Sequence, residues 1–147
     1  MSVTDVPASM QAPHIVTDLP GPRARAVIEQ DERVSSPSLT RVYPLVVERG
    51  HGTVLEDVDG NRFLDFNAGI AVNAAGHAHP HVNAAIHAQV DACRHYGSSD
   101  FYHPTPAQLC ERLAATVPDG MGPARVFLAN SGTEAVEGAL KLARHHT

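Results

Sequence analysis

The chain has 147 residues, of which 43% are apolar and 18% are charged, and this is enough for one modest domain with a hydrophobic core. Sixteen acidic side chains outnumber eleven basic ones, the formal net charge is −5, and the sequence contains no run of basic residues. Neither nucleic acid nor a membrane surface is therefore an expected partner, and a small-molecule substrate is.

The cysteine content and the N-terminus indicate a compartment. Cys93 and Cys110 are the only cysteines, and their spacing is not that of a metal-binding pair. The N-terminus has no basic start followed by an apolar stretch, and no apolar run is long enough to span a bilayer. These features predict a reduced, cytoplasmic protein.

The first part of the chain predicts an arm and a short helix. Residues 1–20 mix Ser, Thr, Pro and Asp with isolated apolar residues, which indicates a flexible N-terminal arm. Gly21–Gln30 is compatible with a helix that ends before the turn at Ser35–Pro37.

Three segments rich in Val, Leu, Phe and Tyr follow, separated by Gly50–Gly52 and by an Asp-Gly turn at Asp59–Asn61. They predict a small antiparallel sheet with strands at Tyr43–Glu48, Thr53–Val58 and Arg62–Phe66.

Asp57, Asp59 and Asn61 alternate like the first ligands of an EF-hand calcium loop. However, the glycine is at the fourth position instead of the sixth, and Ala68 occupies the place of the closing glutamate. A turn is therefore the preferred interpretation.

The next segment, Asn67–Pro80, is small and Gly-rich, which predicts a loop whose backbone can pass close to a ligand. A metal site is an alternative, since this region contains His77, His79 and His81. No cysteine or carboxylate lies among these histidines, and Pro80 is placed as the first-turn residue of a helix. We expect no metal site.

Two helices and a loop come next. Apolar residues at helical spacing predict helices over Pro80–Arg94 and Pro106–Val117, the second ended by Pro118-Asp119-Gly120. Tyr96–Tyr102 is a polar and aromatic loop.

The last segment predicts a strand at Arg125–Ala129, a tight turn and a helix that starts near Gly132. Ser131 can cap this helix, with Glu134 as the other half of a capping box. The free N–H groups of the first turn and the helix dipole favour an anion such as phosphate. The alternative is that the motif only begins a helix.

The segment Phe127–Arg144, FLANSGTEAVEGALKLAR, resembles the segment by which class III aminotransferases bind the phosphate of pyridoxal phosphate. DGNRFLDF at Asp59–Phe66, AGIAV at Ala68–Val72 and GHAHP at Gly76–Pro80 are similar to further motifs of the family and follow its order. The match covers roughly residues 21–147.

The resemblance implies an α/β chain, the N-terminal portion of a fold-type-I transferase, with a small antiparallel segment over 21–75 and the beginning of a large parallel-sheet domain over 76–147. It also implies a cytoplasmic homodimer that moves an amino group between an amine or amino acid and a 2-oxo acid. Ser131, Gly132 and Thr133 would bind the cofactor.

The resemblance further implies that Ile70, Phe101 and Tyr102 line the substrate pocket. The alternatives are that Ile70 and Val72 are core anchors, and that the aromatic pair belongs to a surface loop.

No catalytic residue is expected within the chain. The family's Schiff-base lysine has no counterpart here, because Lys141 is the sole lysine and lies about 12 Å along the helix from Thr133. The sequence therefore predicts a fragment of an aminotransferase that is inactive alone, and the alternative is a non-catalytic anion-binding or remnant module.

Overall fold

The computed structural model describes residues 11–147 of the chain. It divides into two compact units, Met1–Arg94 and His95–Thr147. The predicted flexible arm over residues 1–20 stays a prediction, since residues 1–10 lie outside the described part.

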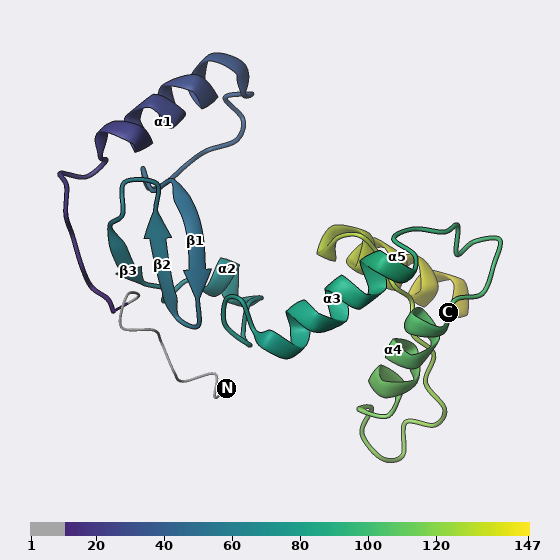
Figure 1. The fold of residues 1–147 in the computed structure, drawn as a ribbon. Helices are drawn as coiled ribbons and strands as arrows, with labels where there is room; N and C mark the ends of the chain where they lie inside the picture. The colour runs from purple at the N-terminus through teal and green to yellow at the C-terminus, as the bar shows by residue number, and fades with distance from the viewer. Residues whose placement is uncertain (1–10) are drawn as a thin grey trace. The chain divides into compact units, whose positions relative to one another are not determined.

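The first unit contains helix α1, followed by a three-stranded antiparallel sheet in the order β1-β2-β3 (Figure 1). Helix α1 is Pro22–Val34, and Pro22 suits its first turn because that position needs no N–H donor. The strands are β1 at Val47–His51, β2 at Val54–Asp57 and β3 at Arg62–Leu64. The predicted helix and the small sheet are thus confirmed.

The first strand differs from its predicted span. It begins at Val47 instead of Tyr43, and it continues through Gly50 to His51. The N–H of Leu45 donates to the carbonyl of Tyr43 at 2.8 Å, so the chain around Pro44 makes a tight turn and the strand starts after it. Because His51 pairs with Val54, the hairpin turn is the two-residue loop that begins at Gly52, whose φ is 54°.

The turn between β2 and β3 is a buried polar hub. Asp57 is 3% exposed, and its carboxylate accepts hydrogen bonds from the N–H groups of Asp59 (2.9 Å) and Asn61 (2.8 Å). Asn61 is fully buried, and its Oδ1 accepts the N–H groups of Val16 (2.8 Å) and Thr17 (3.0 Å). These side chains bind the protein's own donors, as the turn interpretation predicts.

Asp59 also caps α1 from a distance. Its two carboxylate oxygens accept the N–H groups of Arg23 (3.0 Å) and Ala24 (2.8 Å), the first donors of the helix. Gly21 precedes the helix, and a Cβ there would collide with the Asp59 side chain. The turn therefore fixes where α1 begins.

The remainder of the first unit is α2 at Ala68–Ala71 and α3 at Pro80–Ala92. The sequence predicts only a loop over the α2 residues. Pro80 does start α3, as predicted.

The second unit contains α4 at Pro104–Ala114 and α5 at Gly132–His146. The predicted strand at Arg125–Ala129 is wrong, because that segment has no strand neighbour in the described residues to supply ladder hydrogen bonds. No residue of His95–Thr147 is fully buried. Across residues 11–147, none of the helices is both long and apolar enough to cross a membrane.

Candidate functional site

The N-terminus of α5 forms as the sequence predicts. Ser131 has extended backbone, with φ −149° and ψ 159°, and its hydroxyl oxygen accepts the N–H of Glu134 at 3.2 Å. The reciprocal bond differs from a capping box, because Glu134 Oε2 accepts the N–H of Asn130 at 2.7 Å, one residue before the cap. Both bonds hold the turn that leads into the helix.

The next two amides are available to a ligand. In residues 11–147, no protein acceptor is bonded to the N–H groups of Gly132 and Thr133. A Cβ added to Gly132 would meet no atom within 4 Å, so the space beside these donors is open. Two free donors, a helix dipole and the hydroxyls of Ser131 and Thr133 suit a phosphate group.

The segment before the turn lies against α5. A Cβ on Gly138 would come within 3.2 Å of Phe127 Cε1, so the glycine makes room for the aromatic ring. Further along the helix, Lys141 Nζ forms an exposed ion pair of 2.7 Å with Glu137. The only lysine is therefore paired on its own helix, two turns from the free amides.

The segment after β3 has an unusual backbone. Four consecutive residues have positive φ: Ala68 (48°), Gly69 (62°), Ile70 (64°) and Ala71 (61°). The Ile70 and Val72 residues are 84% and 81% exposed, so the alternative that they are core anchors is wrong for this structure.

Three side chains lie at the base of this segment. His77 Nε2 lies 2.7 Å from Asp65 Oδ2, and His77 Nδ1 lies 2.9 Å from Asn73 Nδ2. The hydrogen bond from His77, followed by that from the N–H of Ala68, holds the pKa of the Asp65 carboxyl below its usual value. Asp65 is thus an ionised acceptor at neutral pH.

The other histidines have separate environments. His79 and His81 lie with ring centroids 5.8 Å apart. In the described part of the chain, no three His, Cys, Asp or Glu side chains gather in a way that could hold a metal ion.

The two aromatic residues proposed for the pocket lie in the second unit. The Phe101 ring packs on Tyr96, with centroids 5.0 Å apart and planes at 58°, while Tyr102 is fully exposed. The structure brings Ser131, Gly132 and Thr133 together in one turn, whereas Ile70 belongs to the other unit.

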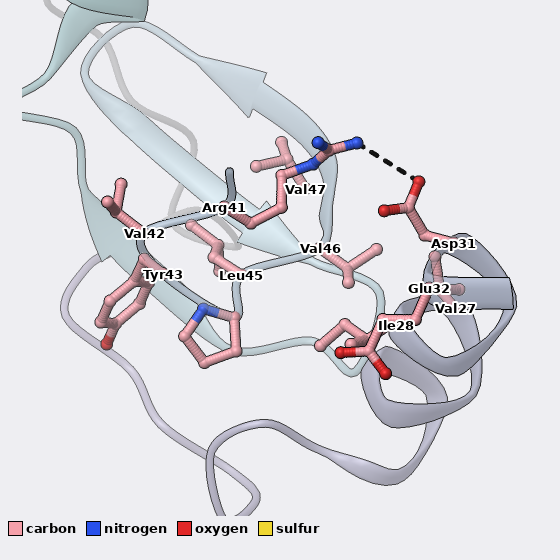
Figure 2. A pocket seen from close by; sticks show the side chains of 11 residues that line it. Val27, Ile28, Asp31, Glu32, Arg41, Val42, Tyr43, Leu45, Val46 and Val47 are labelled. Atoms are coloured by element: carbon pink, nitrogen blue, oxygen red, sulfur yellow. Dashed lines mark hydrogen bonds and ion pairs between the residues drawn. The ribbon is translucent and has the colours of Figure 1, made fainter. Parts of the chain in front are cut away.

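A cavity of about 460 Å³ lies between α1 and the segment before β1 (Figure 2). Apolar side chains such as Ile28 and Val46 line it, and Arg41 and Asp31 form an ion pair of 3.3 Å at its rim. Tyr43 lines the end of the cavity that lies opposite Asp31 (Figure 2). Apolar side chains predominate in the lining, and Asp31, Glu32 and Arg41 add charged groups to it.

Comparison with known proteins decides the family. The model of the family described as aminotransferase class-III matches residues 35–147, which is most of the chain. The chain belongs to the class-III aminotransferase family.

Curated relatives are similar along most of the chain. An acetylornithine aminotransferase of Methanosarcina acetivorans is 43% identical over 84% of this chain and 30% of its own length. An alanine/serine racemase of Pyrococcus horikoshii is 36% identical over 94% of this chain and 29% of its own. The chain thus spans about 30% of the length of the curated relatives it matches.

Solved structures show the same fold. The ornithine aminotransferase of Toxoplasma gondii aligns with a TM-score of 0.72 and 31% identity over 82% of this chain and 27% of that one. The acetylornithine aminotransferase of Elizabethkingia anophelis gives a TM-score of 0.72 and 29% identity over 82% and 30%. The fold class expected for an N-terminal portion of such enzymes is confirmed.

Sequence reasoning missed the role of Asp65, Asn73 and His77. His77 was considered as a metal ligand, and both His77 and Asp65 lie in motifs similar to those of the family, but neither was given a role of its own. The available signal was the Gly-His pair at Gly76-His77, which places a ring directly after a glycine with φ 81°.

Proposed function

We propose that this chain is the N-terminal part of a pyridoxal-phosphate-dependent transaminase, which moves an amino group between an amine or amino acid and a 2-oxo acid. The observation that carries the proposal is the pair of free amides at Gly132 and Thr133 in a chain of the class-III family. When bound, pyridoxal phosphate supplies the electron sink that amino-group transfer requires.

Within this proposal the α5 N-terminus binds the cofactor's phosphate. The amides of Gly132 and Thr133 donate to the phosphate oxygens, and the Ser131 hydroxyl, whose oxygen accepts from Glu134, still has its own hydrogen to donate. Ile70, Phe101 and Tyr102 form part of the substrate pocket wall.

The remaining features of the proposal concern assembly and compartment. We place the protein among fold-type-I enzymes that act as homodimers in the cytoplasm. The low cysteine content, with only Cys93 and Cys110 in 147 residues, supports a reducing compartment. In this proposal Ser131, Gly132 and Thr133 supply half of a phosphate cup, and the catalytic lysine lies outside residues 1–147.

Racemisation of a small amino acid is the second candidate reaction. It is favoured by the similarity to the racemase of Pyrococcus horikoshii, which extends over 94% of this chain. Both reactions use the same phosphate site, so the N-terminal segment does not distinguish them. A chain that carries these residues and a downstream lysine, assayed with alanine alone and then with alanine plus a 2-oxo acid, separates the two.

The phosphate site can be tested on residues 1–147. Inorganic phosphate or pyridoxal phosphate is titrated while the NMR signals of the Gly132 and Thr133 amides are followed. We expect both signals to shift, and we expect Gly132→Asp to abolish the shift because a carboxylate would occupy the open space and repel the anion.

Ala139→Asp is the matched control, since it adds the same charge to an exposed position two turns along α5. Helical circular dichroism shows that each variant keeps the helix. Signal shifts in Gly132→Asp as large as those in the parent chain, or shifts confined to other residues, would contradict the phosphate site. A non-catalytic role of the chain would then be the better interpretation.

A further inference from the structure

The turn after β3 holds a conformation that its own residues disfavour. Ala68, Ile70 and Ala71 all have a Cβ and all have φ between 48° and 64°. The left-handed region is unfavourable for such residues, most of all for the β-branched Ile70. A run of this kind persists only where the surroundings determine it.

The carboxylate of Asp65 holds the start of the turn. Its Oδ1 accepts the N–H groups of Asn67 and Ala68, each at 2.9 Å. Its Oδ2 lies 2.7 Å from Nε2 of His77, twelve residues further along the chain. The side chain of Asp65 is only 7% exposed, so these bonds face little competition from water.

Asn73 closes the other side. Its N–H donates to the carbonyl of Ala68 at 2.9 Å, and its side-chain nitrogen donates to Nδ1 of His77 at 2.9 Å. Because an ionised carboxylate only accepts and an amide nitrogen only donates, His77 is the neutral tautomer with its hydrogen on Nε2. The ring thus connects both ends of the turn.

The hairpin of β1 and β2 fixes His77 itself. Its N–H and C=O form a pair of hydrogen bonds with Gly52, of 2.8 and 2.9 Å. Its ring lies over Gly50, where a Cβ would come within 2.7 Å of Cγ. The histidine is therefore held by a regular element, and the turn is held by the histidine.

We propose that Asp65, Asn73 and His77 form a positioning clamp that holds the Asn67–Val72 turn in its left-handed conformation and so presents Ile70 to the amino substrate. This inference rests on the proposed function for the pocket. The three residues do not touch the reacting atoms. Their role is to keep an apolar side chain, 84% exposed at present, at a fixed place.

The structural part is tested by NMR on the chain, through shifts and couplings that report φ at Ile70. His77→Ala and Asp65→Ala should both remove the positive φ. Asp65→Asn should retain it. Its amide oxygen can accept the N–H groups of Asn67 and Ala68, and its nitrogen can donate to Nε2 of the other histidine tautomer, provided that the Asn73 amide turns its oxygen toward the Nδ1 hydrogen.

His87→Ala is the matched control, since His87 is exposed on α3 and lies outside the clamp. It should leave the Ile70 signals unchanged. A positive φ at Ile70 that survives both His77→Ala and Asp65→Ala would overturn the clamp.

The functional part uses a chain that carries these residues with a downstream lysine. His77→Ala should raise KM for the amino donor about tenfold or more, with kcat changed by less than about threefold and pyridoxal phosphate affinity unchanged. Asp65→Asn should keep the KM close to that of the parent chain, because it retains the turn.

The outcomes separate a failure of the clamp proposal from a failure of the proposed function. An active parent whose KM is unaffected by His77→Ala overturns the presentation of Ile70. A parent without turnover overturns the proposed function, and the clamp is then decided by the NMR signals of Ile70 alone.

Discussion

The side-chain amide of Asn61 donates a hydrogen bond of 2.8 Å to the carboxylate of Asp57, and both residues are buried, at 0% and 3% exposure. The oxygen of the same amide accepts hydrogen bonds from the N–H groups of Val16 and Thr17. One side chain thus joins the N-terminal segment to the hairpin.

We expect Asn61→Ala to destabilise the hairpin by about 2–3 kcal/mol, because it leaves buried donors and a buried carboxylate without partners. The free energy of opening is measured by hydrogen exchange of the β2 amides. Asn83→Ala, at an exposed position on α3, is the control and should change it by less than about 0.5 kcal/mol. An equally small effect of Asn61→Ala would show that the hub does not hold the hairpin.

The elements predicted best are those set by neighbours in sequence. The start of α5 follows from Ser131 and Glu134, and the turn before β3 follows from Asp59-Gly60, where Gly60 has φ 89°. The strand predicted at Arg125–Ala129 failed because a strand needs a hydrogen-bonding partner, and the described residues provide none.

The sequence predicts the candidate site only where its residues are neighbours in the chain. The cofactor-binding residues are contiguous, so a local motif indicates them. The pairing of Asp65 with His77 requires the β1–β2 hairpin to bring together residues twelve apart, which periodicity does not report. The positive φ values around Ile70 were equally hidden, because only Gly69 among those residues favours them.

The acid sensitivity of the turn follows from Asp65. The bond from His77, then that from the Ala68 N–H, lowers the folded-state pKa of Asp65 below its ordinary value of 3.8. A carboxyl with a lowered pKa stabilises the fold above the ordinary value, and this contribution is lost as pH falls through the folded-state pKa. We expect the Ile70 turn to hold at pH 5 and to lose this stabilisation as the pH falls below 3.8 and through the lower, folded-state pKa of Asp65.

The NMR signals of Ile70 followed from pH 6 to pH 2 measure this opening. Asp65→Asn, which does not ionise, should remove the acid-dependent step. A step of the same size in Asp65→Asn would assign it to another group.

The second unit should be much less stable than the first. None of the residues His95–Thr147 is buried, and large apolar residues stay exposed, among them Phe127 (74%), Leu140 (62%) and Leu142 (69%). Such surfaces are rare on independently stable proteins. We expect amides of α4 and α5 to exchange far faster than those of β2.

The hydrophobic dye ANS should bind the isolated chain, and Leu140→Gln with Leu142→Gln should reduce the dye signal. The matched control is Val90→Gln on α3, in the first unit. Cooperative unfolding of the second unit together with the first, at the protection level of β2, would contradict the expectation.

Residues 1–147 alone should show no transaminase activity and no specific lysine adduct with pyridoxal phosphate. Lys141 is the sole lysine, it is paired with Glu137 at 2.7 Å, and it lies about 12 Å along α5 from Thr133. A cofactor whose phosphate binds the helix N-terminus extends away from the helix, so the lysine amine does not reach its aldehyde. Borohydride trapping with stoichiometric cofactor and peptide mapping should give scattered, substoichiometric labelling. A single adduct at Lys141 that disappears in Gly132→Asp, together with turnover that depends on an amino donor, would show that this segment carries its own catalytic lysine.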